Sequence, residues 1–353
     1  MIVKFYFFMK RVVFVLLVLF FAQAYSQDTL YNKALKAIDE KRWFDAEHLL
    51  TKALKNGEDE LRCSYELAWT YYCNDEFQKA INVLKPFLEK PDSIPSDVYQ
   101  LLGNAYDENG NSYKAVDIYT MGLNKYPNAG NLHLELGNIK YKEGNYREAL
   151  YWYEKGIEKD PMFASNYYRA AKVFLMSTEV VWGLLYGEIF MVLEPESERS
   201  KEFSKELFSA YKDGISLGAN ASVDFNNNII VYSDSFERKN VFPSVFNSLM
   251  LKCVRGKRYI DIATLGQIRK LFISNLYKEA KDFDNPLFNY EKKLMDNGLF
   301  DAYNYYLFAY GNTKESSSWI NSHKTMWDKL LKYLRANPIP LTNKYYFSRY
   351  NME

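Results

Sequence analysis

The stretch Gln100–Pro127, QLLGNAYDENGNSYKAVDIYTMGLNKYP, decides the fold of this chain through the spacing of its small residues. The same residue types return 34 positions further along the chain. The first set is Gly103, Gly110, Ala115, Gly122 and Pro127, and the second is Gly137, Gly144, Ala149, Gly156 and Pro161. A constant period of this length indicates tandem structural repeats, whose units bury a continuous core only by stacking on their neighbours.

Each repeat is predicted to be a pair of helices. LHLELGNIKYKEG reads as a first helix that ends at Gly144, because glycine adopts the left-handed conformation of a helix C-terminus without a Cβ clash. YREALYWYEKGIEKDP reads as a second helix that stops before Pro161, since the residue preceding a proline is driven out of helical geometry. We expect five such hairpins within residues 25–197, with one extra residue in the loop at 91–95.

The other small residues are predicted to lie where the two helices of a hairpin cross, because only small side chains allow a close approach there. On the first helices they are Gly103, Gly137 and Ala171, and on the second helices they are Ala46, Ala80, Ala115, Ala149 and Gly183. These positions are therefore set by packing and not by chemistry.

This pattern resembles the tetratricopeptide repeat (TPR) family. The residues that carry the resemblance are Leu102, Gly103, Tyr106, Gly110, Ala115, Tyr119, Gly122 and Pro127, with Leu136, Gly137, Gly144, Tyr146, Ala149, Tyr153, Gly156 and Pro161 in the next unit. The first and fifth units diverge, as terminal units do; the fifth has Thr178 in place of the turn glycine and Gly183 in place of the alanine. The resemblance implies an all-α superhelix that binds other proteins.

The second half, residues 198–353, is predicted to be an all-α domain that follows the repeats. A capping helix is expected at about 198–216, then a loop at 217–228 and a short strand or extended connector at 229–234. Further helical spacing includes one helix from Lys314 to Ala336 with Trp319, His323 and Trp327 on one stripe.

The N-terminus is predicted to be an export signal. Lys4, Lys10 and Arg11 precede the apolar run 12–21, and Ala22-Gln23-Ala24 supplies a small-x-small cleavage site. We expect cleavage after Ala24, with an uncleaved membrane anchor as the alternative and either Met1 or Met9 as the start. The chain is then exported through the Sec route to the periplasm or cell surface, or secreted, from a Gram-negative bacterium.

Charge and cysteine content exclude some classes of partner. Removal of residues 1–24 takes away three basic residues and no acidic ones, so 42 basic residues stand against 44 acidic ones. Because this balance offers no field for phosphates, we expect no nucleic acid partner. Cys63, Cys73 and Cys253 are too few for a disulfide framework and are interpreted as small buried residues, with a bridge to Cys253 left open.

The chain carries little that suggests catalysis, and we expect no enzyme, cofactor or metal site. His48 and His133 lack a second ligand at metal-binding spacing, and His323 reads as a core or edge residue. No phosphate-binding loop, nucleophile elbow or His-Glu-x-x-His run occurs in the sequence. An enzyme with dispersed carboxylates is the remaining catalytic alternative.

The leading hypothesis is a non-enzymatic scaffold that binds a protein or peptide segment on the concave face of its first helices. By helical phase, the residues facing this groove are Tyr65, Trp69, Tyr72, Gln100, Asn104, Asp107, Leu134, Asn138, Tyr141, Tyr168, Lys172 and Leu175. Exposed aromatic residues among them are of the type that anchors partners, although each could also be an ordinary helix residue. The alternative is a binding protein for a glycan or other small ligand, between the repeats and the aromatic C-terminal domain.

Overall fold

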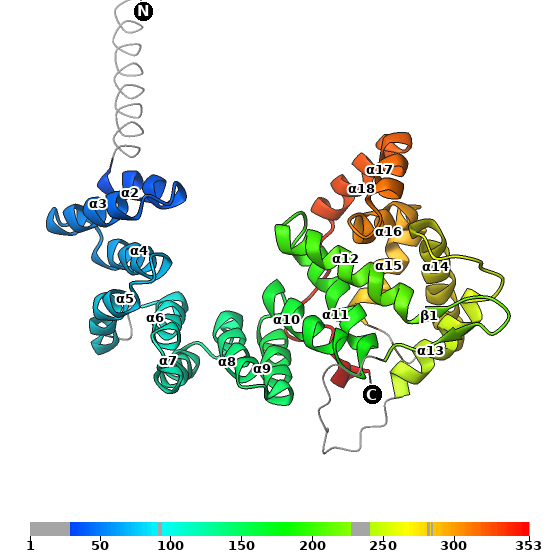
Figure 1. Ribbon diagram of the computed structural model, residues 1–353, viewed down its shortest axis with the longest axis horizontal. Helices are drawn as coiled ribbons and strands as arrows, with labels where there is room; N and C mark the ends of the chain where they lie inside the picture. Colours follow the sequence, from blue (N-terminus) through cyan, green and yellow to red (C-terminus); the bar gives the residue numbers. More distant parts are fainter. Residues whose placement is uncertain (1–28, 91–93, 227–240, 281–282, 284, 353) are drawn as a thin grey trace, which may run out of the picture. The chain divides into compact units, whose positions relative to one another are not determined.

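Helices form nearly all of the regular structure in the residues that the structure describes, as the sequence predicts. The computed structural model describes residues 29–90, 94–226, 241–280, 283 and 285–352, and these contain seventeen α-helices and one two-stranded hairpin (Figure 1). The expected export signal at 1–24 and the extended segment at 229–234 lie outside the described residues, as do 91–93 of the expected loop.

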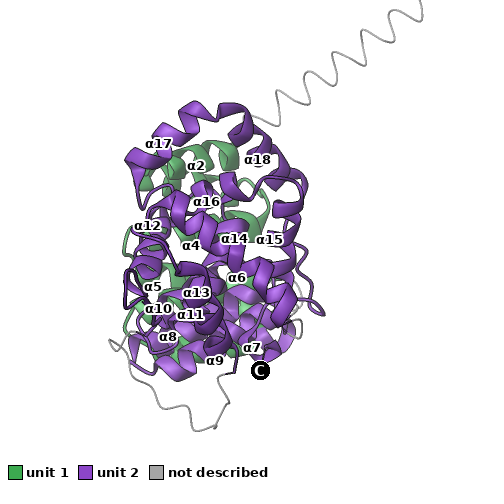
Figure 2. Cartoon of the chain, turned by 90° about the vertical axis from the view of Figure 1, so that its right-hand side faces the viewer, with its two compact units in different colours: residues 1–122 green, residues 123–353 purple. Residues whose placement is uncertain are grey.

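The first compact unit ends at Gly122 (Figure 2). Its three hairpins pair α2 with α3, α4 with α5, and α6 with α7. The bounds are α2 (Leu30–Asp39), α3 (Trp43–Lys55), α4 (Glu60–Cys73), α5 (Phe77–Leu84), the 3₁₀ helix η1 (Lys85–Glu89), α6 (Ser96–Glu108) and α7 (Ser112–Lys125). Ala34, Leu50 and Leu67 are buried together where α2, α3 and α4 meet, so neighbouring hairpins share one core.

The second compact unit begins at Leu123 and holds two further hairpins, α8 with α9 and α10 with α11, followed by the C-terminal helices (Figure 2). Its elements are α8 (Gly130–Lys142), α9 (Tyr146–Lys159), α10 (Ala164–Leu175), α11 (Val180–Leu193), α12 (Glu198–Asp213), β1 (Ile215–Ser216), β2 (Ser222–Val223), α13 (Val241–Val254), α14 (Ile262–Glu279), α15 (Pro286–Asp296), α16 (Phe300–Phe308), α17 (Thr313–Ser322), α18 (Lys324–Ala336) and η3 (Arg349–Asn351).

The small residues act within the hairpins as the sequence predicts. A Cβ atom built on Gly103 would lie 2.1 Å from the Tyr119 ring, so α6 and α7 could not approach as they do with any larger residue there. Gly110 and Gly144 end the first helices with φ of +82° and +75°, a region that favours glycine. Packing and turn geometry therefore explain the repeated glycines.

Helix α11 joins the repeat-like hairpins to the C-terminal helices. Apart from Glu188, its sequence, VVWGLLYGEIFMVL, is apolar all round, and every residue from Val180 to Met191 is buried. Trp182 on α11 contacts Phe242 on α13, whose ring in turn lies 5.9 Å from that of Phe288 on α15. An aromatic core thus runs from α11 into the second half of the chain.

The C-terminal half differs from the sequence prediction at two places. The single helix expected from Lys314 to Ala336 is broken at His323, whose φ of −125° and ψ of 33° are not helical, so two helices, α17 and α18, form instead. The expected capping helix ends at Asp213, and a short antiparallel hairpin follows, in which Ile215 pairs with Val223 and Ser216 with Ser222; its second strand lies in the segment expected to be a loop.

Candidate functional site

Aromatic side chains line one face of α4 in the first unit. The rings of Trp69 and Tyr72 are stacked, with centroids 5.8 Å apart, and Tyr72 meets Phe77 edge-on. Trp69 keeps 38% of its surface exposed, and Tyr72 is half-buried. The pair therefore presents a rigid apolar surface at the positions where the sequence predicts partner contact.

Two carboxyl groups act on Tyr65, which lies on the same helix. Tyr65, one turn before Trp69, is half-buried, and burial, together with the negative charges of Asp97 and Glu66, raises its pKa to about 12. Asp97 belongs to α6, which also carries Gln100, another of the predicted contact residues. The first unit thus combines an exposed aromatic stack with carboxylates on two neighbouring first helices.

Two predicted contact residues, Asn104 and Asn138, are tied into the hairpins. The Tyr119 hydroxyl donates to Asn104 Oδ1 at 2.6 Å, and the Tyr153 hydroxyl donates to Asn138 Oδ1 at 3.1 Å. Asn138 also donates to Glu135 at 2.8 Å. Both asparagines are half-buried, and their amides hold the first helix of a hairpin to the second. The recurrence of Asn and Tyr at equal spacing in two units is the sequence signal for this role.

The remaining predicted residues lie on α6, α8 and α10. Asp107 accepts a hydrogen bond from Ser112 at 2.5 Å, Leu134 is buried, and Tyr141 meets Tyr146 edge-on at 5.4 Å. Tyr168 packs against Phe190 and Phe203, and Leu175 lies beneath Gly183. Apart from Asp107, which belongs to the first unit, these predicted positions serve mainly to pack the helices of the second unit.

Helix α12 extends the repeat period beyond Pro195, where the sequence pattern ends. Lys172 Nζ on α10 lies 2.7 Å from Glu206 on α12, and Arg199 Nη2 donates to Ser165 at 2.8 Å. Both pairs are separated by 34 residues, the period of the upstream units. The predicted capping helix is therefore stacked as the first helix of a sixth unit, and it engages the predicted contact residue Lys172.

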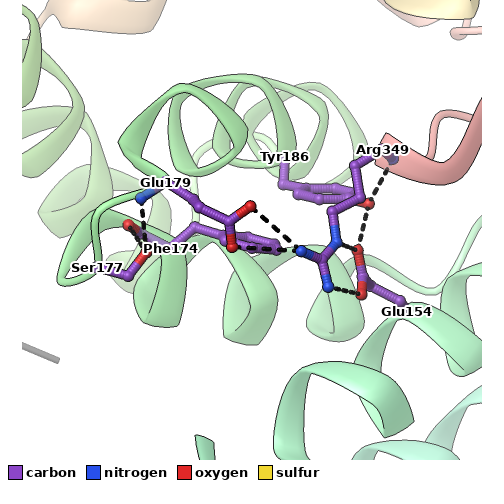
Figure 3. Close-up of polar contacts among 6 residues, drawn as sticks. All are labelled: Glu154, Phe174, Ser177, Glu179, Tyr186 and Arg349. Atoms are coloured by element: carbon purple, nitrogen blue, oxygen red, sulfur yellow. Dashed lines mark hydrogen bonds and ion pairs between the residues drawn. The ribbon is translucent and has the colours of Figure 1, made fainter. Parts of the chain in front are cut away.

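A buried arginine that the sequence analysis missed ties the C-terminus to the second helices of the fourth and fifth hairpins (Figure 3). Arg349 donates through Nε and Nη2 to the two carboxylate oxygens of Glu154 on α9, at 2.8 and 3.1 Å. Its Nη1 lies 3.3 Å from Glu179, just before α11. The Arg349 side chain is 5% exposed and that of Glu154 is 3% exposed, so water screens this pair little.

The close approach of Glu154 and Glu179 keeps Arg349 charged although it is buried. Burial lowers the pKa of Arg349, but the charges of Glu154 and Glu179 outweigh this effect and raise its pKa. Tyr186 donates to Glu154 at 3.0 Å, and its pKa is raised by burial and by the Glu154 charge. The arginine is therefore charged and the tyrosine neutral at physiological pH.

A second buried arginine joins four helices of the same unit. Arg269 on α14 binds both oxygens of Glu188 on α11, and it also donates to Glu291 on α15 and to Asn304 on α16. Glu188 and Arg269 are almost fully buried, with side chains 1% and 4% exposed. Two carboxyl groups thus share one guanidinium in the core, which links α11 to the C-terminal helices.

A cavity of about 230 Å³ opens between the α11–α12 connection and helices α16 to α18. Met191, Tyr306 and Trp327 are among its walls, and Lys201 and Glu196 lie at its polar side. The Tyr306 hydroxyl donates to the backbone oxygen of Met191 at 2.8 Å, so this polar group is satisfied inside the wall. The cavity offers mainly apolar and aromatic contact.

Within the described residues, no group of three or more His, Cys, Asp or Glu side chains is arranged to hold a metal ion. Of the helices described, none is both long and apolar enough to cross a membrane. Cys63, Cys73 and Cys253 are free thiols, the first and last of them buried. His133 Nδ1 lies 3.0 Å from the Ala129 carbonyl, and burial lowers the pKa of this histidine.

Comparison with known proteins identifies one segment. Residues 137–177, from the middle of α8 to just past the end of α10, match the family model described as a TPR repeat. No curated protein matches the chain.

Several solved structures are similar to parts of the chain. A thermophilic TPR protein from Thermus thermophilus is 16% identical, with 51% of this chain and 98% of that chain covered and a TM-score of 0.43. The C-terminal part of a TPR repeat-containing protein from Cytophaga hutchinsonii is 13% identical, with 87% and 94% covered and a TM-score of 0.42. MamA protein is 20% identical, with 48% and 93% covered and a TM-score of 0.37.

Proposed function

We propose that this chain is a non-enzymatic scaffold that binds a protein or peptide segment on the inner face of its first helices. The observation that carries the proposal is the exposed Trp69–Tyr72 stack on α4, since exposed, rigid aromatic pairs are typical anchors of protein interfaces. The TPR match at residues 137–177 supports the same class of function.

The chemistry beside the stack favours one kind of partner. Glu66 on α4 and Asp97 on α6 place negative charge near Tyr65. A partner segment with an apolar or aromatic residue for the stack and a basic residue beside it would be complementary in both shape and charge. Asn104 and Asn138 contribute to the proposal less, because their amides hold the hairpins together.

Selection of peptides tests this proposal directly. A displayed peptide library is panned on the purified chain, and enriched peptides are measured by fluorescence anisotropy against the parent and Trp69→Ala. We expect enriched peptides to combine aromatic and basic residues, and affinity to fall about tenfold or more in the variant, as for a central anchor.

Tyr113→Ala is the matched control. Tyr113 is an aromatic residue of the same unit, 88% exposed, but it lies on the second helix α7. Its removal should leave peptide affinity unchanged. Equal losses in the two variants, or a library that yields no binding peptide, would count against the proposed surface.

We further propose that the chain works outside the cytoplasm, after removal of residues 1–24. The apolar run and the Ala22-Gln23-Ala24 site support this location. Fractionation of the native host with N-terminal mass spectrometry should recover a chain that begins at Tyr25 in the cell envelope or medium. Recovery of an unprocessed chain from the cytoplasm would contradict the export proposal.

The 230 Å³ cavity favours a second candidate function, the binding of a small ligand with an aromatic or glycan ring face. Tyr306 and Trp327 would supply the stacking surfaces. A panel of sugars and aromatic carboxylates is screened by thermal shift on the parent and Trp327→Ala. A ligand of this site should raise the melting temperature of the parent alone.

A further inference from the structure

The C-terminal segment 339–352 is bound to the second unit mainly through side chains. Ile339, Phe347, Arg349 and Met352 are buried, although the segment contains no helix longer than η3. Its backbone hydrogen bonds are largely local: Thr342 and Tyr345 exchange two at 2.8 and 2.9 Å, and Met352 N donates to the Arg349 carbonyl at 3.1 Å. The segment therefore has the form of a docked peptide.

The pocket for Arg349 matches the full geometry of a guanidinium group. Glu154 accepts two parallel hydrogen bonds, from Nε and Nη2, and Glu179 accepts a hydrogen bond from Nη1. All three nitrogens of the side chain are therefore engaged. The guanidinium carbon lies 5.1 Å from the centroid of the Phe174 ring. A lysine ammonium could reproduce neither the bidentate pair nor the planar stacking.

A second pocket holds Phe347, which precedes Arg349 by two residues. Phe347 is fully buried and meets Tyr186 edge-on at 5.3 Å, with Trp182 at 6.4 Å. Between the two pockets, the backbone N–H of Arg349 donates to the Tyr186 hydroxyl at 3.1 Å. Tyr186 therefore contacts the Phe347 ring and accepts a hydrogen bond from the Arg349 backbone. It also donates to Glu154, the carboxylate that binds the guanidinium.

The walls of both pockets are held together without the segment. Phe174 on α10 and Tyr186 on α11 are stacked, with centroids 5.5 Å apart and planes 9° apart, and Tyr167 lies 6.0 Å from Tyr186. Pro338, just before the segment, and Pro340, within it, follow the end of α18 and have no backbone N–H with which to pair to other elements. The walls of both pockets are thus also held by contacts of their own, and the connection that leads to residues 347–349 lacks a backbone donor at two positions.

We propose that α9, α10 and α11 form a recognition site for an extended peptide with the pattern Phe-x-Arg, and that the chain's own residues 347–349 occupy it as a detachable intramolecular ligand. This site lies on other helices than the Trp69 surface and does not depend on the proposed function. Its ligand class is an arginine-bearing peptide, because the buried Glu154, the half-buried Glu179 and an aromatic floor select a guanidinium over other cations.

Fragment exchange in the full chain tests the site. A protease recognition sequence is inserted between Asn337 and Pro338, both of which are exposed. After cleavage, a fluorescein-labelled peptide of residues 338–353 is added, and its uptake is followed by anisotropy. We expect uptake by the cleaved chain, none by the uncleaved chain, and displacement by unlabelled peptide.

Variant peptides separate recognition from general attraction. Arg349→Ala should bind at least about tenfold more weakly, as expected when a buried charged contact is lost, and Arg349→Lys should also bind more weakly than the parent. Lys344→Ala removes the same charge from an exposed turn residue and should bind like the parent. Equal binding by all four peptides would overturn the proposal.

Hydrogen exchange in the intact chain provides a second, independent measurement. We expect the amides of residues 346–352 to exchange through local opening, faster than those of α10 and α11, and to exchange faster still in Arg349→Ala while the helices stay protected. If the segment and helices exchange only together, or if cleavage at the linker unfolds the unit, residues 339–352 are an integral part of the core and the proposed site is wrong.

Discussion

A Cβ atom on Gly137 would lie 2.4 Å from Cε1 of Tyr153, closer than two such atoms can approach. The glycine of α8 and the tyrosine of α9 therefore form one packing contact at the centre of the fourth hairpin. Gly266 on α14 in the same unit offers a contrast, since a Cβ atom there would meet Asn304 at 3.4 Å, an ordinary contact.

Replacement of these two glycines should have opposite effects. Both lie inside helices, so alanine gains about 1 kcal/mol of helix propensity at each. In Gly137→Ala, overpacking against Tyr153 should outweigh this gain and lower the free energy of unfolding by about 1–3 kcal/mol. Gly266→Ala should be neutral or stabilising. Urea unfolding followed by circular dichroism measures both, and a Gly137→Ala variant as stable as the parent would show that the hairpin opens to accept a methyl group.

The buried pair of Glu188 and Glu291 should make stability fall as the pH rises. Burial, and then the charge of Glu188, raises the pKa of Glu291 well above its usual 4.5, against the opposing effect of Arg269. The folded chain therefore binds this proton more tightly than the unfolded chain does. The resulting stabilisation is complete below about pH 4.5 and is lost as the pH passes the raised pKa.

Glu291→Gln tests this coupling because glutamine resembles the protonated carboxyl group. Urea unfolding is measured for parent and variant from pH 5 to pH 9, below the range where the buried tyrosines ionise. We expect the parent to lose stability across this window and the variant to lose less. Parallel curves would mean that Glu291 stays in one protonation state throughout.

Substitution of Asn138 should lower stability, whereas substitution of Trp69 should weaken peptide binding. Asn138→Ala leaves the buried Tyr153 hydroxyl without its acceptor and should cost about 1–3 kcal/mol of stability, with peptide affinity unchanged. Trp69→Ala removes an exposed ring and should change stability by less than about 1 kcal/mol while weakening peptide binding. Thermal unfolding and anisotropy on the same preparations check both expectations, and a reversal of the two effects would move the binding surface to the hairpin amides.

The three cysteines should be slow to react in the folded chain. Burial raises the pKa of the Cys63, Cys73 and Cys253 thiols, so little of the reactive thiolate is present at neutral pH. Cys73 is half-buried and should react first with a thiol reagent, while Cys63 and Cys253 should wait for unfolding. Titration of fewer than three thiols in the unfolded, unreduced protein would reveal the disulfide that the sequence leaves open.

The hairpins could be predicted from sequence because their determinants are local and repeat. Gly110 and Gly144 mark helix ends through positive φ, and Gly103 and Gly137 mark close contacts, so spacing alone places both. The break at His323 could not be predicted in this way, because the apolar stripe continues through it and only the backbone at that residue changes.

The buried ion pairs could not be predicted for a different reason. Arg349 and Glu154 are 195 residues apart, and each looks like one of many charged residues on a helix or tail. Nothing in a single sequence distinguishes a buried arginine from a solvated one when its partners come from distant helices. Among the predicted contact residues, helical phase selected Trp69 and Tyr72, which are accessible. It also selected Asn104 and Asn138, because their packing role depends on tyrosines of the opposite helix, which helical phase does not include.

The position of helix α12 restricts where further repeat units can be added to the chain. It continues the 34-residue spacing as half of a unit, and α16 lies against it, where Ser204 donates to the Leu307 carbonyl at 2.7 Å and Phe208 fills the space beside Gly311. Gene duplication could add whole hairpins before α10 without disturbing this junction. Duplication after α12 would separate it from α16 and expose the apolar side that is buried there, so lengthening of the array is restricted to the upstream units.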